Sequence, residues 1–241
     1  MTWDAYLLLK TAGIVVFVFI GSFYASKNGF SLAKSLVITA CAVMLGFIFS
    51  RGWFILQHAF GSEPYAPETF TEAWNDAGSV LYGWVSGGTL AIWLLCKAWK
   101  LKPVQFLDYV LPWLLFAQAL NRFGCFAGEC CWGSETTFFV HVWNSWVRAE
   151  VHPVQIYEAV FDISLFILCF KKARRPGSRT FLYFFGYPAG RFFFEFLRGD
   201  NQSALLFLTV PQVASLVILT WTWLLYKSKS FRAKHLSFQR H

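Results

Sequence analysis

Apolar stretches of about 20 residues, the length needed to cross a bilayer core, recur along the whole chain and constrain its fold more than any other feature. They cover 5–24, 34–57, 79–98, 104–122, 153–171, 178–197 and 208–227. Only 14% of the 241 residues are charged, whereas soluble domains carry roughly 25%. The sequence therefore predicts an all-α, polytopic membrane protein with seven transmembrane helices, forming a single membrane-embedded domain over residues 1–241. The first stretch lacks a cleavage site and is expected to remain as a helix.

Charged residues in the connections predict the orientation of these helices, because short cytoplasmic loops are enriched in lysine and arginine. One side would carry Lys27, Lys34, Lys97, Lys100, Lys102, Lys171, Lys172, Arg174, Arg175, Arg179, Lys227, Lys229, Arg232, Lys234 and Arg240. The other side would carry the acidic residues Glu63, Glu68, Glu72, Asp76, Glu129, Glu135 and Glu150. We therefore expect the N-terminus outside and the C-terminus in the cytoplasm. This sidedness explains the net charge of +8 without a nucleic-acid partner.

Two outer segments are long. Residues 57–78 contain Pro64 and Pro67 and are expected to form a loop. Residues 125–151 are rich in phenylalanine and tryptophan. Aromatic side chains favour the headgroup zone, so we expect this second segment to lie on the membrane surface.

Several charged residues fall inside or beside the apolar stretches, where a charge costs about 2.5–3.5 kcal/mol on the insertion scale. They are Lys10, Arg51, Arg122, Glu158, Asp162, Arg191, Glu195 and Arg198. Arg191, Glu195 and Arg198 are spaced to share one helical face. Two interpretations stay open: a network of salt bridges between helices, or an anion site, since arginine matches phosphate bidentately.

Residues 121–133, with the sequence NRFGCFAGECCWG, are the densest in reactive and conformationally permissive residues. An arginine, a carboxylate, three thiols and three glycines follow directly on an apolar run. The spacing of Cys125, Cys130 and Cys131 fits neither a zinc finger nor a C-x-x-C pair. A disulfide, a metal site and a thiol acyl carrier are the alternatives for these cysteines.

Three motifs resemble those of the bacterial prolipoprotein diacylglyceryl transferases. Residues 121–133 are similar to the signature Gly-Arg-x-Gly-Asn-Phe-x-Asn-Gly-Glu-x-Trp-Gly. His152 to Glu158 reads HPVQIYE and matches His-Pro-x-Gln-x-Tyr-Glu, and Gly186 to Arg198 reads GYPAGRFFFEFLR and matches Gly-Tyr-x-x-x-Arg-x-x-x-Glu-Phe-x-Arg. Weaker similarity extends to Ser50, Arg51, Gly52, Trp74, Tyr82, Gly83, Phe106, Leu107, Asp108 and Gln212.

The chain departs from the family pattern at chemically important positions. Tyr82 stands where the family has the histidine of a His-Gly-Gly sequence. Cys125 replaces the signature asparagine, and Cys130 falls on the family's glutamate position, with Glu129 one residue earlier. A tyrosine of the family's first helix has no clear counterpart.

The resemblance implies transfer of a diacylglyceryl group from phosphatidylglycerol to the thiol of a lipobox cysteine on an exported preprotein, in the bacterial inner (plasma) membrane. Glycerol phosphate leaves, and no metal or organic cofactor is expected because the lipid is itself an activated donor. The implied catalytic residues are Arg122, Arg191, Glu195 and Tyr82. The implied phosphatidylglycerol-binding residues are Arg51, Arg122, Cys125, Gly133, His152, Gln155, Tyr157, Glu158, Arg191 and Arg198.

Activation of the acceptor thiol is the step for which the sequence offers several candidates. An unperturbed tyrosine, with a pKa of about 10, is a poor base at neutral pH. Glu129, Glu195 or His152 could substitute for it, or the arginines alone could lower the pKa of the thiol. Two other functions stay open: a transferase with a different acceptor, and a lipid-binding or redox-sensing protein without catalytic activity.

Overall fold

The computed structural model describes residues 3–60, 80–173, 175–199 and 208–228 of the chain. Most of the outer loop expected at 57–78 lies outside these residues, together with Trp74 and the four acidic residues of that loop. Arg174 and the basic residues of the tail beyond 228 also lie outside.

Each of the seven predicted apolar segments contains a helix. The elements are α1 (Trp3–Val15), a π-helical turn η1 (Val16–Ile20), α2 (Gly21–Lys27), α3 (Leu32–Phe60), α5 (Leu81–Ala98), α6 (Pro103–Ala127), β1 (Val142–Asn144), β2 (Ala149–Val151), α7 (Val154–Lys171), α8 (Ser178–Phe194), a 3₁₀ turn η2 (Glu195–Leu197) and α9 (Val210–Lys227). Two stretches, Asp4–Lys27 and Leu32–Ile55, are long and apolar enough to cross a bilayer, with mean hydropathies of 2.0 and 2.1.

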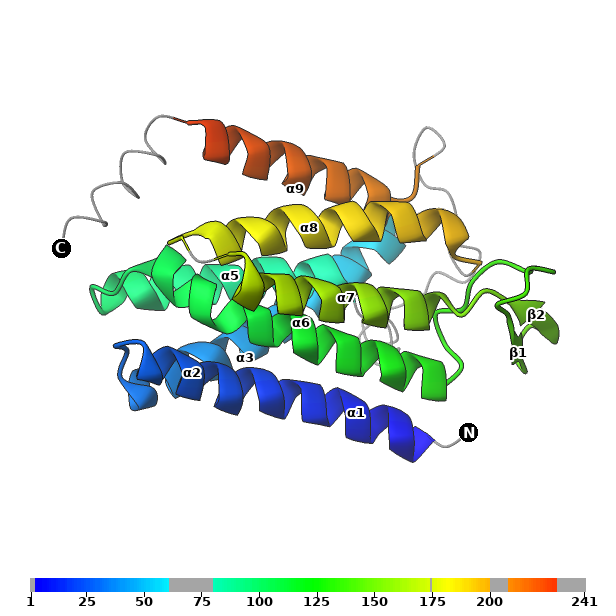
Figure 1. Ribbon diagram of the computed structural model, residues 1–241, viewed down its shortest axis with the longest axis horizontal. Coiled ribbons are helices and arrows are strands. Elements are labelled where there is room, and N and C mark those ends of the chain that lie inside the picture. The colour runs from blue at the N-terminus through cyan, green and yellow to red at the C-terminus, as the bar shows by residue number, and fades with distance from the viewer. Residues whose placement is uncertain (1–2, 61–79, 174, 200–207, 229–241) are drawn as a thin grey trace.

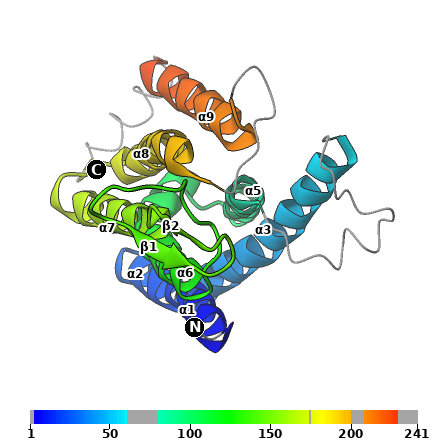
Figure 2. The same cartoon turned by 90° about the vertical axis from the view of Figure 1, so that its right-hand side faces the viewer.

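Most of the helices run along the long axis of the molecule, while α3 is tilted away from it (Figures 1 and 2). The β1–β2 hairpin and the start of α1 lie at one end (Figures 1 and 2). The connections α2–α3, α5–α6 and α7–α8 lie at the opposite end, where α9 also finishes (Figure 1). The predicted basic connections therefore share one end of the bundle, and the signature segment with its hairpin lies at the other.

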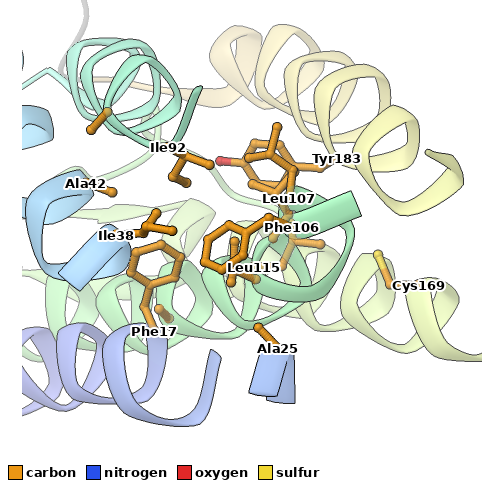
Figure 3. Packing of buried hydrophobic residues seen from close by; sticks show 14 of the residues in the cluster. Phe17, Ala25, Ile38, Ala42, Ile92, Phe106, Leu107, Leu115, Cys169 and Tyr183 are labelled. Atoms are coloured by element: carbon orange, nitrogen blue, oxygen red, sulfur yellow. The ribbon is translucent and has the colours of Figure 1, made fainter. Parts of the chain in front are cut away.

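Helix α6 lies at the centre of the packing. It contacts α1, α2, α5, α7 and α8, while α3 packs on α5 and α9 on α8. Figure 3 shows Phe106, Leu107 and Leu115 of α6 surrounded by side chains from neighbouring helices, including Phe17, Ile38, Ile92 and Tyr183. A buried polar contact joins this core as well, because Gln118 of α6 donates to the hydroxyl of Tyr183 at 3.1 Å.

The outer faces of the helices carry large apolar side chains, which suits lipid-facing surfaces. Examples from four helices are Leu8, Met44, Trp93 and Trp221. A soluble protein would rarely leave so much apolar surface in water.

Close approach of α3 and α5 positions two of the expected site residues. A Cβ atom built on Gly83 would lie 2.4 Å from the Cα of Ser50, so only glycine fits there. The Ser50 hydroxyl also accepts a hydrogen bond from the backbone nitrogen of Val80 at 2.9 Å. Arg51 and Tyr82, which neighbour these contact residues, are thereby held on adjacent helices.

The described chain is mostly helical, as expected, and the outer segment adds one short β-hairpin that the sequence did not predict. Residues 142–151 form a short antiparallel hairpin in which Trp143 pairs with Glu150. The Asn144 side chain accepts hydrogen bonds from the nitrogens of Trp146 and Val147, which closes the turn. Phe138, Phe139, Trp143 and Trp146 around this hairpin are all exposed.

The helix α3 continues to Phe60, so the loop expected from residue 57 begins later than predicted.

Candidate active site

Glu158 forms salt bridges with two arginines from different helices. Its Oε2 atom lies 2.8 Å from Nε of Arg122 on α6, and its Oε1 atom accepts a hydrogen bond from Nη1 of Arg191 on α8 at 2.7 Å. All three side chains are nearly buried, with exposures of 6–11%. The salt-bridge network left open by the sequence is therefore present, and it joins α6, α7 and α8 through one carboxylate.

A second carboxylate extends this network towards α9. Nη2 of Arg191 lies 2.7 Å from Oε2 of Glu195, as the predicted spacing of one helical turn allows. Glu195 also accepts a hydrogen bond from the Thr209 hydroxyl at 2.7 Å. Thr209 is the N-cap of α9 and forms a capping box with Gln212. The start of α9 is thus tied to the arginine network.

The spacing predicted that Arg198 would lie on the same helical face as Arg191 and Glu195, but the α-helix does not continue to that residue. Helix α8 ends at Phe194, the 3₁₀ turn η2 follows, and Arg198 has an extended backbone. Its backbone forms a bridge with Gly133 of the signature segment, and its charge interacts with Glu158 and Cys131. Arg51, the other expected arginine, is 7% exposed and lies over the Phe54 ring at 5.6 Å.

Backbone hydrogen bonds bring the three motifs together around Gly133. Its nitrogen donates to the His152 carbonyl at 3.1 Å, and the Ser134 nitrogen donates to Leu197 at 2.8 Å. The Gly199 nitrogen closes the arrangement by donating to Trp132 at 3.1 Å. The signature segment therefore lies between the start of α7 and the end of α8, and it fixes both.

Tyr82 forms a hydrogen bond with Ser215 of α9. The oxygen atoms are 2.5 Å apart, and Ser215 itself donates to the Pro211 carbonyl at 2.7 Å. Because a serine has a single hydroxyl proton, Tyr82 is the donor in this pair. Tyr82 also interacts electrostatically with Arg191, Glu195 and Glu158, so it borders the same network.

The remaining residues of the second motif face the signature segment. Gln155 donates to the Cys130 carbonyl at 2.7 Å. His152 stands before the N-cap Pro153 and makes no side-chain cap of α7, and its ring packs near Phe138 and Tyr157. The Tyr157 hydroxyl donates to the Val140 carbonyl at 3.4 Å. Gln155 and Tyr157 thus hold the outer loop, while Glu158 alone of this motif contacts the arginines within the described residues.

Glu129 is engaged by the hairpin rather than by the arginines. Its carboxylate accepts hydrogen bonds from the side chain and the nitrogen of Ser145. These two bonds hold the pKa of Glu129 below its ordinary value. Asn144 binds the Glu129 carbonyl at 3.0 Å, so both ends of the residue fix the hairpin to the signature segment.

The cysteines of the signature segment lie together as free thiols. The sulfur atoms of Cys125, Cys130 and Cys131 are all within 4.8 Å of one another. Arg122, one turn before Cys125, interacts electrostatically with Cys125 and Cys131. The disulfide considered from the sequence is not formed in this structure.

A small cavity lies beside the shared carboxylate. Its walls are formed by Glu158, Phe161, Asp162, Tyr187, Arg191 and Phe194. A volume of about 10 Å³ admits roughly one water molecule. The cavity is therefore too small, as it stands, to hold a phospholipid headgroup.

The sequence did not place several of these contacts. Asp162 lies one turn after Glu158 and borders the cavity. Thr209, the N-cap of α9, and Ser215 within that helix complete the network, and α9 is an apolar helix with no charged motif. The available signals were the family similarity at Gln212 and the Thr-x-x-Gln spacing at the start of α9, which is typical of a capping box.

Comparison with known proteins connects this geometry to a family. The profile of the family described as prolipoprotein diacylglyceryl transferase matches residues 1–227. Proteins of this family are membrane proteins, in agreement with the two apolar spans of this chain.

Individual relatives carry the same enzyme name. The phosphatidylglycerol–prolipoprotein diacylglyceryl transferase of Clostridium tetani is 35% identical over 62% of this chain and 63% of its own length. The second such enzyme of Clostridium perfringens is 34% identical over 65% of this chain and 64% of its length. The Staphylococcus aureus (strain Newman) enzyme is 28% identical over 89% and 80%. The chain thus spans somewhat less than two thirds of the two clostridial proteins.

The two arginines that meet at Glu158 come from the first and third motifs, and the carboxylate comes from the second. Together with a profile match over 227 residues, this shows that the chain belongs to the prolipoprotein diacylglyceryl transferase family.

Proposed function

We propose that this protein transfers a diacylglyceryl group from phosphatidylglycerol to the cysteine thiol of a prolipoprotein, releasing glycerol phosphate. The observation that carries the proposal is the convergence of Arg122 and Arg191 on Glu158 at 2.8 and 2.7 Å in a buried site. The family membership and the names of the relatives support the choice of these substrates.

The shared carboxylate suits a site that receives an anion. Glu158 interacts with Arg122, Arg191 and Arg198, whereas Glu195 pairs with Arg191, so the guanidiniums outnumber these two carboxylates. A phosphate that replaces Glu158 on either arginine would keep the charges paired in a medium of low dielectric. Prepositioned donors of this kind stabilise charge as it develops on a leaving group.

The residues take the following roles in this proposal. Arg122 and Arg191 stabilise the departing phosphate, Glu195 orients Arg191, and Tyr82 contacts the headgroup from α5. The phosphatidylglycerol site is bordered by Arg51, Arg122, Cys125, Gly133, His152, Gln155, Tyr157, Glu158, Arg191 and Arg198.

The membrane arrangement is part of the proposal. All seven helical segments would cross the bacterial inner (plasma) membrane, with the N-terminus outside and the C-terminus in the cytoplasm, as one domain. The end with the basic connections would face the cytoplasm, following the positive-inside tendency. The exposed aromatic residues around the hairpin would then lie in the outer headgroup zone.

Purified protein in lipid nanodiscs, given phosphatidylglycerol labelled in its acyl chains and a lipobox peptide, tests the proposal. We expect label on the peptide cysteine and loss of transfer by about 100-fold or more in Arg122→Ala and Arg191→Ala. Arg148→Gln is the matched control, because Arg148 is exposed on the hairpin. This variant should transfer the diacylglyceryl group at the wild-type rate.

Two results would contradict this function. One is an unlabelled peptide accompanied by label on another acceptor, such as an amine or alcohol. The other is full transfer by both alanine variants, which would leave the arginines as packing contacts only.

A further inference from the structure

The three thiols of the signature segment form a cluster with the dimensions of a metal site. Their sulfur atoms lie within 4.8 Å of one another. Zinc–sulfur bonds of about 2.3 Å in a tetrahedral arrangement place sulfur atoms about 3.8 Å apart, so small side-chain rotations would complete the site. Within the described parts of the chain, this is the one group of three or more side chains able to hold a metal ion.

The turn that carries these thiols has an unusual backbone. Glu129 and Cys131, on either side of Cys130, have φ angles of +54° and +60°. Residues other than glycine adopt this left-handed conformation only where the surroundings enforce it, and such residues gather at functional sites. Here the turn brings Cys130 and Cys131 back towards Cys125 in the last turn of α6.

Contacts from two directions hold the turn in place. The Cys130 nitrogen donates to the Cys125 carbonyl at 3.1 Å. Gln155 of α7 holds the Cys130 carbonyl at 2.7 Å, and Asn144 of the hairpin holds the Glu129 carbonyl at 3.0 Å. The ligand positions are therefore prearranged by parts of the chain that lie far apart in sequence.

The chemistry of three cysteines favours a soft ion and leaves one position open. Thiolates select zinc over the hard cations. Zinc sites with three protein ligands keep a fourth position for water or substrate, as catalytic sites do. Three thiolates and one Zn²⁺ carry a single negative charge, and the nearby guanidinium of Arg122 offsets it.

We propose that Cys125, Cys130 and Cys131 bind a Zn²⁺ ion whose fourth position takes the acceptor thiol and activates it as a thiolate. This inference rests on the proposed transferase function and adds a ligand role for Cys125 beside its place in the lipid site. It explains how the acceptor thiol loses its proton in this chain. Tyr82 stands at the family's histidine position, and its hydroxyl donates a hydrogen bond to Ser215. A thiol bound to zinc is deprotonated by the charge of the ion.

The step balances without an oxidant or reductant. The acceptor thiol coordinates Zn²⁺ and releases its proton to water. Its sulfur attacks the glycerol carbon that bears the phosphate ester, the C–S bond forms, and the C–O bond breaks. The electron pair of that C–O bond leaves with glycerol phosphate beside the arginines, and the neutral thioether, a weak ligand, leaves the zinc.

Metal content and ligand spectroscopy of the full-length protein in nanodiscs test this inference. We expect about one zinc per chain, and X-ray absorption should show sulfur ligands. In the Co²⁺-substituted protein without lipid, a lipobox peptide with cysteine should strengthen the thiolate-to-metal charge-transfer band. The same peptide with serine should leave that band unchanged.

Variants separate this site from unspecific thiol binding. Cys130→Ser and Cys131→Ser should each lower zinc content and transfer, while Cys41→Ser on α3 should change neither. Removal of the ion from wild-type protein by a chelator, followed by its return, should abolish and then restore transfer in a chain that has not been altered.

The outcomes distinguish failure of this inference from failure of the transferase function. Transfer at the normal rate by zinc-free protein, or a mass two hydrogens short that shows a disulfide within the cluster, would overturn the zinc site and leave the transferase intact. Zinc binding with a cobalt response to the thiol peptide, but no lipidated product, would instead contradict the transferase function.

Discussion

The nitrogen of Gly133 donates to the carbonyl oxygen of His152 at 3.1 Å, and a Cβ atom on Gly133 would lie 2.4 Å from that same oxygen. The backbones of the signature segment and the start of α7 are therefore in direct contact, with no room for a side chain at position 133. Since the neighbouring residues of the signature also pair with Leu197 and Gly199, this contact aligns all three motifs. The arginine network depends on that alignment, because its members come from helices α6, α7 and α8.

Replacement of Gly133 by alanine should disturb this alignment. We expect a loss of about 1–3 kcal/mol in stability, typical of overpacking, together with a larger loss of transfer. Thermal unfolding in detergent and the labelled-lipid assay measure the two effects. Gly52→Ala is the control, because a Cβ on Gly52 of α3 meets no atom within 4 Å. This substitution should leave the stability unchanged or raise it slightly. Equal behaviour of the two variants would contradict the role of Gly133.

Glu158→Gln should separate the structural and chemical roles of the shared carboxylate. Arg122 and Arg191 would lose their common counter-ion, and breaking such buried pairs costs about 3–5 kcal/mol. Added glycerol phosphate should raise the unfolding temperature of this variant more than that of the wild type, because the anion can replace the lost charge. Glu150→Gln on the exposed hairpin is the control. An equal rise in unfolding temperature with glycerol phosphate in the variant and the wild type would argue against a phosphate site at these arginines.

Thr209→Val should weaken the connection between α9 and the arginine network. The hydroxyl caps α9 and donates to Glu195 at 2.7 Å, and loss of an N-cap typically costs about 0.5–2 kcal/mol. We expect reduced stability and reduced turnover, because Glu195 then orients Arg191 less well. The control Thr222→Val, on the same helix, loses only a hydrogen bond to the Phe184 carbonyl at 3.3 Å. Similar turnover in both variants would count against the network.

Tyr82→Phe should reduce transfer only modestly, by about 3–10-fold, which is the worth of one neutral hydrogen bond. The hydroxyl donates to Ser215 and is therefore not prepared to accept a proton. The measurement is the pH dependence of kcat/KM for wild type and variant. A loss of several hundred-fold, with an altered pH profile, would identify Tyr82 as the base and contradict thiol activation by zinc.

The helices were the most predictable part of this molecule. Long apolar stretches can satisfy their backbone groups in lipid only as helices, so length and hydropathy were sufficient to locate them. The hairpin was missed because its strands have three residues each and lie among aromatic residues that suit a membrane surface equally well.

The site was predictable in its members but not in its contacts. Sequence spacing gave the Arg191–Glu195 pair, since α8 and the following turn keep helical geometry to that point. It did not indicate that the helix ends before Arg198, where η2 and an extended residue replace the continued helix. Convergence of Arg122 and Arg191 on one carboxylate depends on the packing of three helices, which local spacing cannot report.

The left-handed conformation of Glu129 and Cys131 limits which side chains this turn can accept. Branched Cβ atoms clash most strongly in that region. We therefore expect valine, isoleucine and threonine to be absent from both positions in variants that keep the turn. Glycine, asparagine and aspartate could occupy position 129 with a small cost in conformational free energy. A library randomised at this codon should therefore enrich for small or amide side chains, whatever chemistry the neighbouring thiols perform.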